Sequence, residues 1–332
     1  MVPRRMIMRM MTTLARAVPG LAIVTLLSVS PVRAADTVTI GTVGSPSANL
    51  WPLFIGIEKG FYTAENIKPD VVYIPSSAAV IQQLSAGSLD MTMSTGIVDP
   101  IRAIDQGAAL ALARFEVQVP PYALLAKPSI KSLKDLKGKV ISVGGPKDIT
   151  RLYVDRMLAP QGLKAGDFDY VYAGATTARA QALLGGAVDA AILLPPSNFQ
   201  VQSQGYNDLG LAMQYAPELA FSGTVVNKAW AARSADVLKR VLAAQSKSTD
   251  YLYNPNNRAE AVNILVKVSG QKPEDVEKSF DFFIRNDLFD RSGKISRVKM
   301  NALIDALVGL GDVKALGDIE RFLLPGVAQL SD

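Results

Sequence analysis

The stretches "SSAAVIQQLSAGSLDMTMSTG" (Ser76–Gly96) and "ATTARAQALLGGAVDAAILLP" (Ala175–Pro195) follow one pattern, 99 positions apart. Each begins with hydroxyl residues, continues as an apolar helix, and passes through a Gly and an Asp into a short strand. The pattern predicts a strand–helix–strand unit that occurs twice in the chain.

The Gly and the Asp of each copy have a structural interpretation. Gly87 and Gly186 end their helices, where a left-handed backbone conformation costs Gly little. Asp90 and Asp189 begin the next strand and lack the second titratable group that acid–base catalysis needs. We therefore expect structural roles for both acids.

The first 34 residues have the layout of a secretory signal. Basic residues come first, an apolar run covers Leu21–Val29, and the small residue Ala34 ends the segment. The run is shorter than the roughly 20 residues that a membrane-spanning helix needs. These features predict a cleaved signal peptide over residues 1–34 and a periplasmic protein, by either the general or the twin-arginine route.

The net positive charge of the chain comes from this predicted signal segment. The sequence has 35 basic and 30 acidic residues, and residues 1–34 contain five Arg and no acid. The remaining chain is therefore balanced. A neutral chain without a basic stripe is a poor partner for nucleic acids or anionic membranes, so we expect no nucleic-acid partner.

The sequence contains no Cys and no His. Their absence excludes disulfides, thiolate nucleophiles, a Ser-His-Asp triad and ordinary zinc sites. Lys, Tyr and carboxylates can still support catalysis, so an enzyme is disfavoured without being excluded. We predict no catalytic residues, no metal site and no cofactor.

Strands alternate with helices from Asp36 into the second copy of the repeated unit. This alternation indicates three-layer α/β lobes with mainly parallel sheets. The chain after the signal is longer than one core usually holds, which favours two lobes. Helical apolar spacing dominates the sequence after Lys228 and predicts a helical C-terminal tail that returns to the first lobe.

The hydroxyl residues at the two helix starts allow two interpretations. Ser76, Ser77, Thr176 and Thr177 can cap free backbone N–H groups, which typically stabilises a helix by ~1 kcal/mol. The same N–H groups, at the positive end of the helix dipole, can instead bind the oxygen atoms of a ligand. Neighbouring residues can take different roles.

Ligands of open parallel sheets bind outside the carboxyl ends of the strands. The loops after the predicted strands are rich in hydroxyl and small residues, which can surround a small polar ligand without reacting with it. The ligand-binding residues predicted on this basis are Ser45, Ser47, Asn49, Trp51, Ser76, Ser77, Ser94, Thr95, Gly96, Gly145, Lys147, Thr176, Thr177 and Pro195.

Four stretches of the chain carry a resemblance to a known family. They are "GSPSANLWPLFIGIEKGFYTAENI", "PSSAAVIQQLSAGSLDMTMS", "LKDLKGKVISVGG" and "ARAQALLGGAVDAAILLPP". Together, in this order and spacing, they resemble the periplasmic substrate-binding proteins of nitrate/sulfonate/taurine-type ABC importers, within the thiamine-pyrimidine synthesis-like superfamily. The resemblance extends over about residues 38–260.

The resemblance implies a type II periplasmic-binding-protein fold, with two α/β lobes joined by crossing strands near Tyr122–Ala126 and Phe221–Val226. Lobe 1 then comprises residues 35–122 and 222–332, with the C-terminal helices, and lobe 2 comprises residues 123–221. The resemblance also implies that the loops named above contact the ligand. The histidine and the cysteine-rich segment of the synthase branch are absent here.

Three larger side chains extend the predicted site. Arg151 and Arg179 lie on the predicted first turns of second-lobe helices. Either could clamp a carboxylate or sulfonate through two hydrogen bonds, or remain a solvated surface residue. Trp51 could stack on an apolar ligand body or belong to the core.

These observations predict a secreted, monomeric solute-binding protein. We expect it to capture a small anionic organic solute, of sulfonate or carboxylate type, by lobe closure. Its partner is then an ABC permease with its ATPase. A pyrimidine-synthesis-like enzyme and a ligand sensor for a membrane receptor remain the alternatives.

Overall fold

The computed structural model describes residues 34–314 and 318–332. The elements described below lie within the unit Ala35–Asp332. The predicted signal peptide therefore falls outside the described residues, apart from Ala34.

The first sheet has five strands. In the strand that begins the chain's first sheet, β-branched residues alternate along the sequence, and two of them, Val38 and Ile40, are completely buried. In spatial order the strands are β2 (Ile67–Ile74), β1 (Asp36–Val43), β3 (Met91–Gly96), β10 (Ser222–Asn227) and β4 (Leu110–Val117). β10 runs antiparallel to both its neighbours, and the other strands are parallel to one another.

The second sheet repeats this order. Its strands are β7 (Asp169–Tyr172), β6 (Val140–Val143), β8 (Ala190–Leu193), β5 (Ala123–Ala126) and β9 (Asn207–Leu211). β5 is the antiparallel strand and occupies the place that β10 has in the first sheet. In the repeated unit, α3 (Ser77–Ser85) and β3 correspond to α6 (Thr176–Leu184) and β8. The matching strand order explains why the sequence contains the unit twice.

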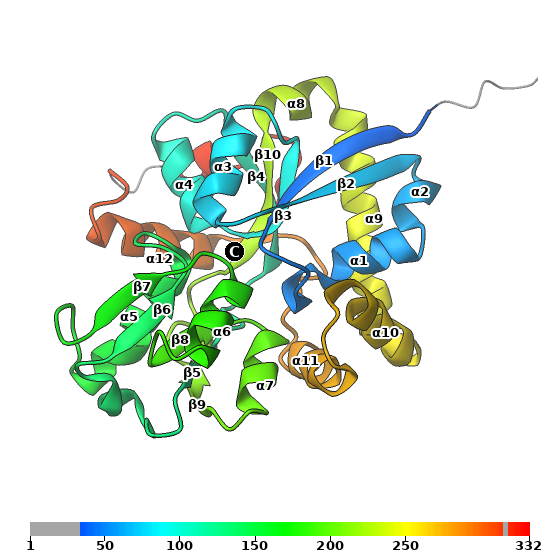
Figure 1. The fold of residues 1–332 in the computed structure, drawn as a ribbon. Helices are drawn as coiled ribbons and strands as arrows, with labels where there is room; N and C mark the ends of the chain where they lie inside the picture. The colour runs from blue at the N-terminus through cyan, green and yellow to red at the C-terminus, as the bar shows by residue number, and fades with distance from the viewer. Residues whose placement is uncertain (1–33, 315–317) are drawn as a thin grey trace, which may run out of the picture. The chain divides into compact units, whose positions relative to one another are not determined.

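The chain passes between the two sheets twice, as Figure 1 shows. Residues 118–122 connect β4 to β5, and residues 215–221 lead from the second sheet back to β10. We call each sheet with its surrounding helices a half of the molecule. The lobe boundaries proposed from the sequence, at residues 122 and 222, separate the strands of the two halves.

Helices cover both sheets, so the predicted three-layer architecture is confirmed. Those of the first half are α1 (Trp51–Glu58), α2 (Phe61–Ala64), α3, α4 (Val98–Asp105), α8 (Lys228–Arg233) and α9 (Ala235–Tyr253). The second half contains α5 (Ile149–Leu158), α6 and α7 (Ser197–Gln202).

The predicted helical tail is also present. It consists of α10 (Arg258–Ser269), α11 (Pro273–Arg285) and α12 (Arg297–Gly309), with the short strands β11 (Ile295–Ser296) and β12 (Leu330–Ser331). The tail packs on the first half through α1 and α4, and the Leu324 N–H donates to the Leu112 carbonyl on β4 at 2.8 Å. α11 also contacts α7 of the second half.

The Asp of the repeated unit has the same structural role in both halves. Asp90 Oδ2 accepts from the Thr39 N–H on β1 at 2.9 Å, and Asp189 Oδ2 accepts from the Val140 N–H on β6 at 3.0 Å. Each carboxylate thus ties the start of one strand to the neighbouring parallel strand. The expectation that these acids are structural agrees with this geometry.

Candidate functional site

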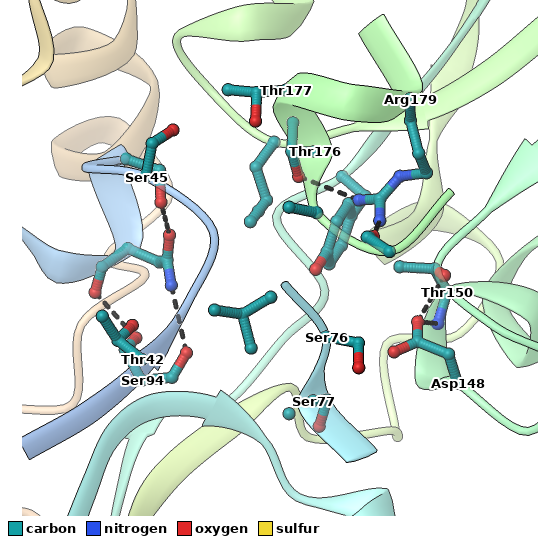
Figure 2. Close-up of a pocket in the computed structure, with 18 of the residues that line it drawn as sticks. Thr42, Ser45, Ser76, Ser77, Ser94, Asp148, Thr150, Thr176, Thr177 and Arg179 are labelled. Atoms are coloured by element: carbon teal, nitrogen blue, oxygen red, sulfur yellow. Dashed lines mark hydrogen bonds between the residues drawn. The ribbon is translucent and has the colours of Figure 1, made fainter. Parts of the chain in front are cut away.

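A pocket lies at the carboxyl ends of the parallel strands of both halves. Its residues come from the loop after β1, the start of α3 and the end of β3 in the first half, and from the starts of α5, α6 and α7 in the second (Figure 2). The lining comprises Thr42, Val43, Ser45, Pro46, Ser47, Asn49, Ser76, Ser77, Ser94, Gly96, Tyr122, Asp148, Ile149, Thr150, Gly174, Ala175, Thr176, Thr177, Arg179, Leu194, Ser197 and Phe221.

The wall from the first half is held by hydrogen bonds among its own polar groups. The Asn49 side chain donates to the Ser94 carbonyl at 3.1 Å, and the Ser94 hydroxyl donates to the Asn49 carbonyl at 2.7 Å. Ser47 Oγ donates to Asn49 Oδ1 at 2.5 Å. Ser94 adopts φ 52°, a left-handed conformation that is uncommon for residues other than Gly and that surrounding contacts must maintain. This wall therefore presents fixed hydroxyl and amide groups.

The start of α3 combines the two roles proposed for its hydroxyl residues. Ser76 is the N-cap, and its Oγ accepts from the Ala79 N–H at 3.3 Å. Ser77 also lines the pocket, and its hydroxyl has no hydrogen-bond partner among the described residues. One serine therefore caps the helix, and its neighbour has hydrogen-bonding capacity to offer.

The start of α6 differs, because no side chain caps it. Ala175 occupies the N-cap position, and Thr176 Oγ1 accepts from Arg179 Nη2 at 2.8 Å. The first backbone N–H groups of α6 therefore have no side-chain acceptor, and the positive end of the helix dipole lies at the pocket. This arrangement favours the oxygen atoms of a ligand.

Arg179 places a buried guanidinium at the pocket. The residue is only 3% exposed, and its Nε donates to the Ile192 carbonyl at 2.8 Å. Its other hydrogen bonds reach the Gly174 carbonyl and Thr176, and it lies over the Tyr122 ring at 6.0 Å. All these acceptors are neutral, so they orient the guanidinium without cancelling its charge.

Tyr122 closes the pocket beneath Arg179. Burial raises the pKa of the Tyr122 phenol above its ordinary value, and this effect outweighs the opposite influence of the nearby guanidinium. The phenol is therefore uncharged at neutral pH. It contributes an aromatic surface and a neutral hydroxyl group to the pocket.

Asp148 is a pocket residue that sequence reasoning missed. It is the N-cap of α5, and its Oδ1 accepts from the Thr150 N–H at 2.9 Å and from the Thr150 hydroxyl. The predicted site instead included the flanking loop residues Gly145 and Lys147. The sequence "DIT" carries a usable signal, since Asp is among the preferred N-cap residues and an N-cap lies at the strand-to-helix turn where ligands bind.

The pocket also contains smaller residues that were not predicted. Thr42, Val43 and Pro46 lie beside predicted loop residues of the first half. The others belong to the second half of the molecule and to the crossings. They are Ile149, Thr150, Gly174, Ala175, Leu194, Ser197 and Phe221.

Trp51 and Thr95, which the sequence predicted as ligand-binding residues, do not line this pocket. Trp51 is fully buried in the core, its Nε1 donates to the Ala261 carbonyl at 2.7 Å, and its ring packs edge-on against Phe280 and Phe283. Thr95 is fully buried on β3. Because successive strand side chains point to opposite faces, Thr95 faces away from a pocket that includes its neighbour Ser94.

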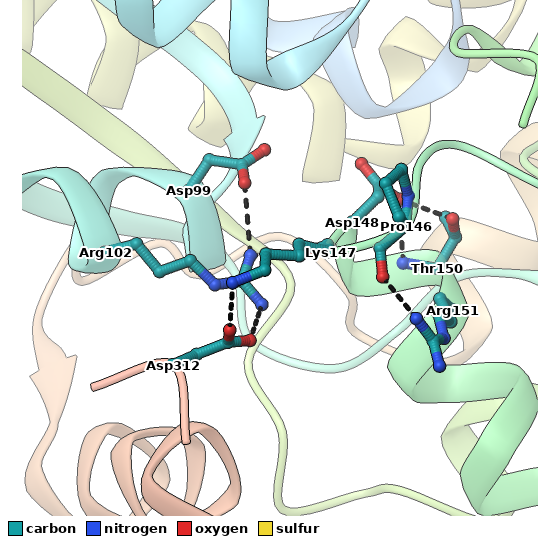
Figure 3. Close-up of polar contacts among 8 residues, drawn as sticks. All are labelled: Asp99, Arg102, Pro146, Lys147, Asp148, Thr150, Arg151 and Asp312. Atoms are coloured by element: carbon teal, nitrogen blue, oxygen red, sulfur yellow. Dashed lines mark hydrogen bonds and ion pairs between the residues drawn. The ribbon is translucent and has the colours of Figure 1, made fainter. Parts of the chain in front are cut away.

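Lys147 and Arg151 also lie outside the lining of this pocket. Figure 3 shows their polar contacts. Lys147 Nζ forms an ion pair with Asp312 at 2.7 Å. Arg151 Nη1 donates to the Pro146 carbonyl at 2.7 Å. Arg151 therefore does not line the pocket, whereas Arg179 does.

Gly145 and Pro195 are likewise absent from the lining. Gly145 lies in the loop before α5, one turn from the Asp148 N-cap. The Pro195 carbonyl accepts from the Ala48 N–H at 3.1 Å and so joins the two halves beside the pocket. Its contribution is to the contact between the halves.

The described residues show neither a membrane span nor a metal cluster. Within 34–314 and 318–332, no helix has the length and apolar character needed to cross a bilayer. In the same part of the chain, no three acidic side chains converge to hold a metal ion.

Two α/β halves joined by two crossings, with a pocket lined from both, define a type II periplasmic-binding-protein fold. The chain belongs to the NMT1/THI5-like family, whose model matches residues 47–259. The family membership predicted from the four sequence stretches is thereby confirmed. No curated protein matches the sequence.

Solved structures share the fold at low sequence identity. The alkanesulfonate-binding protein SsuA from Xanthomonas axonopodis pv. citri is 20% identical, with a TM-score of 0.71 over 90% of this chain and 100% of that one. The nitrate-binding protein NrtA from Synechocystis PCC 6803 is 17% identical, with a TM-score of 0.65 over 74% and 70%. The desulfurization enzyme DSZB is 14% identical, with a TM-score of 0.64 over 88% and 97%. At these identities the likeness concerns the fold alone.

Proposed function

We propose that this protein is a periplasmic solute-binding protein that captures a small polar solute in the pocket and delivers it to an ABC permease with its ATPase. The observation that carries the proposal is the composition of the pocket. Hydroxyl groups and helix N-termini from both halves surround one buried guanidinium whose hydrogen bonds all reach neutral acceptors. Such groups bind an acidic group by hydrogen bonds and orient it.

The family and the fold support the proposed solute-binding function. Proteins named as sulfonate-binding and nitrate-binding share the fold over most of the chain. A sulfonate or carboxylate group fits the proposed site, with its oxygen atoms at the start of α6 and beside Arg179. Export through the predicted signal peptide and action as a monomer belong to the same proposal.

The test is a binding screen of the exported protein. Thermal shift followed by calorimetry would cover sulfonates, carboxylates, nitrate and pyrimidines. We expect one acid-bearing class to raise the melting temperature. A ligand at 100 times its Kd stabilises the folded state by about 2.7 kcal/mol. If no compound in the panel binds, the solute-binding function is wrong.

A pair of arginine variants tests the place of binding. Arg179→Lys keeps the charge but loses the fork of donors, so we expect at least ten-fold weaker binding of the acid. Arg151→Lys changes an arginine outside the pocket and is the matched control. Equal losses in both variants would place the ligand elsewhere.

An enzyme remains the second candidate, because the structure with a TM-score of 0.64 is named as a desulfurization enzyme. The absence of Cys and His from the sequence disfavours this candidate. Product formation by the pure protein from a compound that binds it would establish an enzyme. A stoichiometric ligand recovered unchanged would support the solute-binding function.

A further inference from the structure

Two bulges flank the antiparallel strand β10 in the first sheet. On β3, Met93 and Ser94 together lie opposite the single residue Thr224 of β10. On β4, Glu116 is the extra residue where the register with β10 shifts again. A bulge leaves its extra residue outside the regular ladder, and bulges are frequent beside functional sites, where they re-aim a side chain. The two bulges therefore release Ser94 and Glu116 from the ladder on either side of β10.

The Glu116 carboxylate lies beneath the pocket wall of the first half. The residue is 6% exposed, and it lines a small cavity together with Asn49 and Ser94, which also line the pocket. Its Oε1 accepts from Gln245 Nε2 on α9 at 2.5 Å and from the Thr224 hydroxyl. The carboxylate is thus buried behind the wall and held from two elements.

Among the described residues, the titratable groups around Glu116 are Arg114, Asp290 and Tyr62. The Arg114 guanidinium donates to the Ser246 hydroxyl at 2.9 Å and to the Asp290 carbonyl at 3.3 Å. Burial raises the pKa of the Tyr62 phenol, which is therefore uncharged at neutral pH. The Glu116 carboxylate depends mainly on neutral donors.

A set of hydrogen bonds leads from Glu116 to the pocket. The Ser94 backbone N–H donates to the carboxylate, and this bond opposes the effect of burial on the Glu116 pKa. The Ser94 carbonyl accepts from the Asn49 side chain at 3.1 Å, and Asn49 Oδ1 accepts from the Ser47 hydroxyl at 2.5 Å. Ser94, Asn49 and Ser47 all line the pocket. The carboxylate therefore supports this wall at its left-handed residue, Ser94.

Both Glu116 and Ser94 cost stability. Burial is the main influence on Glu116 and raises its pKa above the ordinary value of 4.5, so the ionised carboxylate lowers the free energy of unfolding at neutral pH. The φ of 52° at Ser94 adds backbone strain. Strain and perturbed pKa values concentrate at functional sites. Here both occur at one wall of the pocket, which points to a role in binding.

We propose that Glu116 is a positioning residue, whose buried carboxylate holds Ser94 in its left-handed conformation and thereby fixes the pocket wall of Ser94, Asn49 and Ser47. This inference rests on the solute-binding function proposed above. Glu116 is not part of the pocket lining, so it acts through Ser94. Protonation removes the charged acceptor of the Ser94 N–H. The wall is therefore fixed above the Glu116 pKa and loosens as the pH falls through it.

Amide NMR of the exported, ligand-free protein tests the proposal. The Ser94 amide signal should titrate with a midpoint above 4.5, because its acceptor becomes protonated. The side-chain NH₂ signals of Asn49, which donates to the Ser94 carbonyl, should move with the same midpoint. In Glu116→Gln both signals should be displaced at neutral pH, and neither should titrate. Asp290→Asn, which alters the other acid of the cavity, is the control and should keep both titrations.

A second variant and a binding measurement extend the test. Thr224→Val removes one donor to the ionised carboxylate, so the midpoint of the Ser94 titration should rise. Ethanesulfonate, measured by calorimetry at neutral pH, is the binding probe, and Glu116→Gln should bind it about five-fold more weakly or worse. The same variant should melt at no lower temperature, because a buried charge is gone. If ethanesulfonate does not bind, the two NMR signals decide.

Three results would overturn the positioning role. The first is a Ser94 amide signal that does not titrate, or that titrates equally in Glu116→Gln. The second is a Glu116→Gln protein that melts at a lower temperature with unchanged Ser94 and Asn49 signals, since Glu116 then serves only the fold. The third is unchanged affinity of this variant for ethanesulfonate. All three leave the solute-binding function standing, which only failure of the entire screening panel overturns.

Discussion

The Asp189 carboxylate accepts from Lys127 Nζ at 2.8 Å and from the Val140 N–H at 3.0 Å. These hydrogen bonds, the one from Lys127 foremost, hold the pKa of Asp189 below its ordinary value. The unfolded chain therefore binds a proton at a higher pH than the folded protein does. The resulting stabilisation is complete above the unfolded value of about 4 and is lost as the pH falls through the folded value.

Replacing this carboxylate should reduce stability in a pH-dependent way. We expect Asp189→Asn to lower the free energy of unfolding by about 1 kcal/mol near neutral pH, because a charged acceptor is lost at a half-exposed site. The deficit should shrink as the pH falls below about 4. Urea denaturation across this range measures it. Asp70→Asn, at an exposed position on β2, is the control and should change the free energy of unfolding little at any pH. If the deficit of Asp189→Asn does not vary with pH, the lowered pKa of Asp189 does not stabilise the fold.

At the residue level, the position of several hydroxyl side chains at the pocket could be predicted from strand ends. Ser45, Ser77, Ser94 and Thr176 line the pocket because the carboxyl ends of parallel strands converge. The core position of Trp51 could not be predicted, because its apolar packing partners lie more than 200 residues away in α11 and no local pattern reveals them. Whether Arg151 or Arg179 lines the pocket likewise depends on which face of each helix is turned toward the other half of the molecule.

Elements were more predictable than side-chain roles. The hydroxyl start, apolar helix, Gly and Asp of each repeated unit correspond to α3–β3 and α6–β8. The ends of elements depend on short-range contacts that periodicity does not show. The strand β9 ends at Leu211, whose N–H donates to the Gln214 side-chain oxygen at 3.2 Å as a helical turn forms. The helical sequence after Lys228 breaks at Ser234 into α8 and α9.

The helix-ending glycines of the repeated unit give a prediction at this level. Gly87 and Gly186 adopt φ of 79° and 78°, a region that L-residues occupy only with strain. We expect Gly87→Ala and Gly186→Ala each to destabilise the protein by about 1 kcal/mol in thermal or urea unfolding. Gly309→Ala is the control, since Gly309 lies in α12 with open space around it, and should be neutral or stabilising. Unchanged stability in both repeat variants contradicts the cap assignment.

At the scale of the whole molecule, a set of polar contacts joins the two halves beside the pocket (Figure 3). Arg102 on α4 donates to the Lys147 carbonyl of the second half, and Asp312 binds both Arg102 and Lys147. Burial alone would raise the pKa of Asp312, but the hydrogen bonds from Lys147 and Arg102 outweigh it and hold that pKa below its ordinary value. Asp312 therefore stays ionised and bridges the halves at neutral pH.

Removing Lys147 should weaken closure without touching the ligand. In Lys147→Met, Asp312 keeps Arg102 but loses its partner in the second half. An ion pair with one exposed member is worth about 0.2–1 kcal/mol, so ligand dissociation should accelerate by roughly 1.5- to 5-fold, and less so at high salt. Stopped-flow dissociation measures this. Lys137→Met, which affects a pair with Asp167 inside the second half, should leave the rate unchanged. An equal rate in Lys147→Met and the unaltered protein refutes the bridging role.

The two-half organisation could be predicted from the sequence, whereas the contacts between the halves could not. The repeated unit and the length of the chain indicate two α/β halves. Asp312 and Lys147 are 165 positions apart, and the intervening sequence carries no periodic pattern that pairs them. Such contacts follow from the relative orientation of two complete sheets.

The place of β10 in the first sheet determines the order in which the protein can form. β4 pairs with β10 and not with β3, so β4 has no sheet partner until residues 222–227 have been synthesised. The second sheet, built from residues 123–211, is complete before that point. During synthesis the inserted half can therefore fold first, and the half that begins the chain must wait for it.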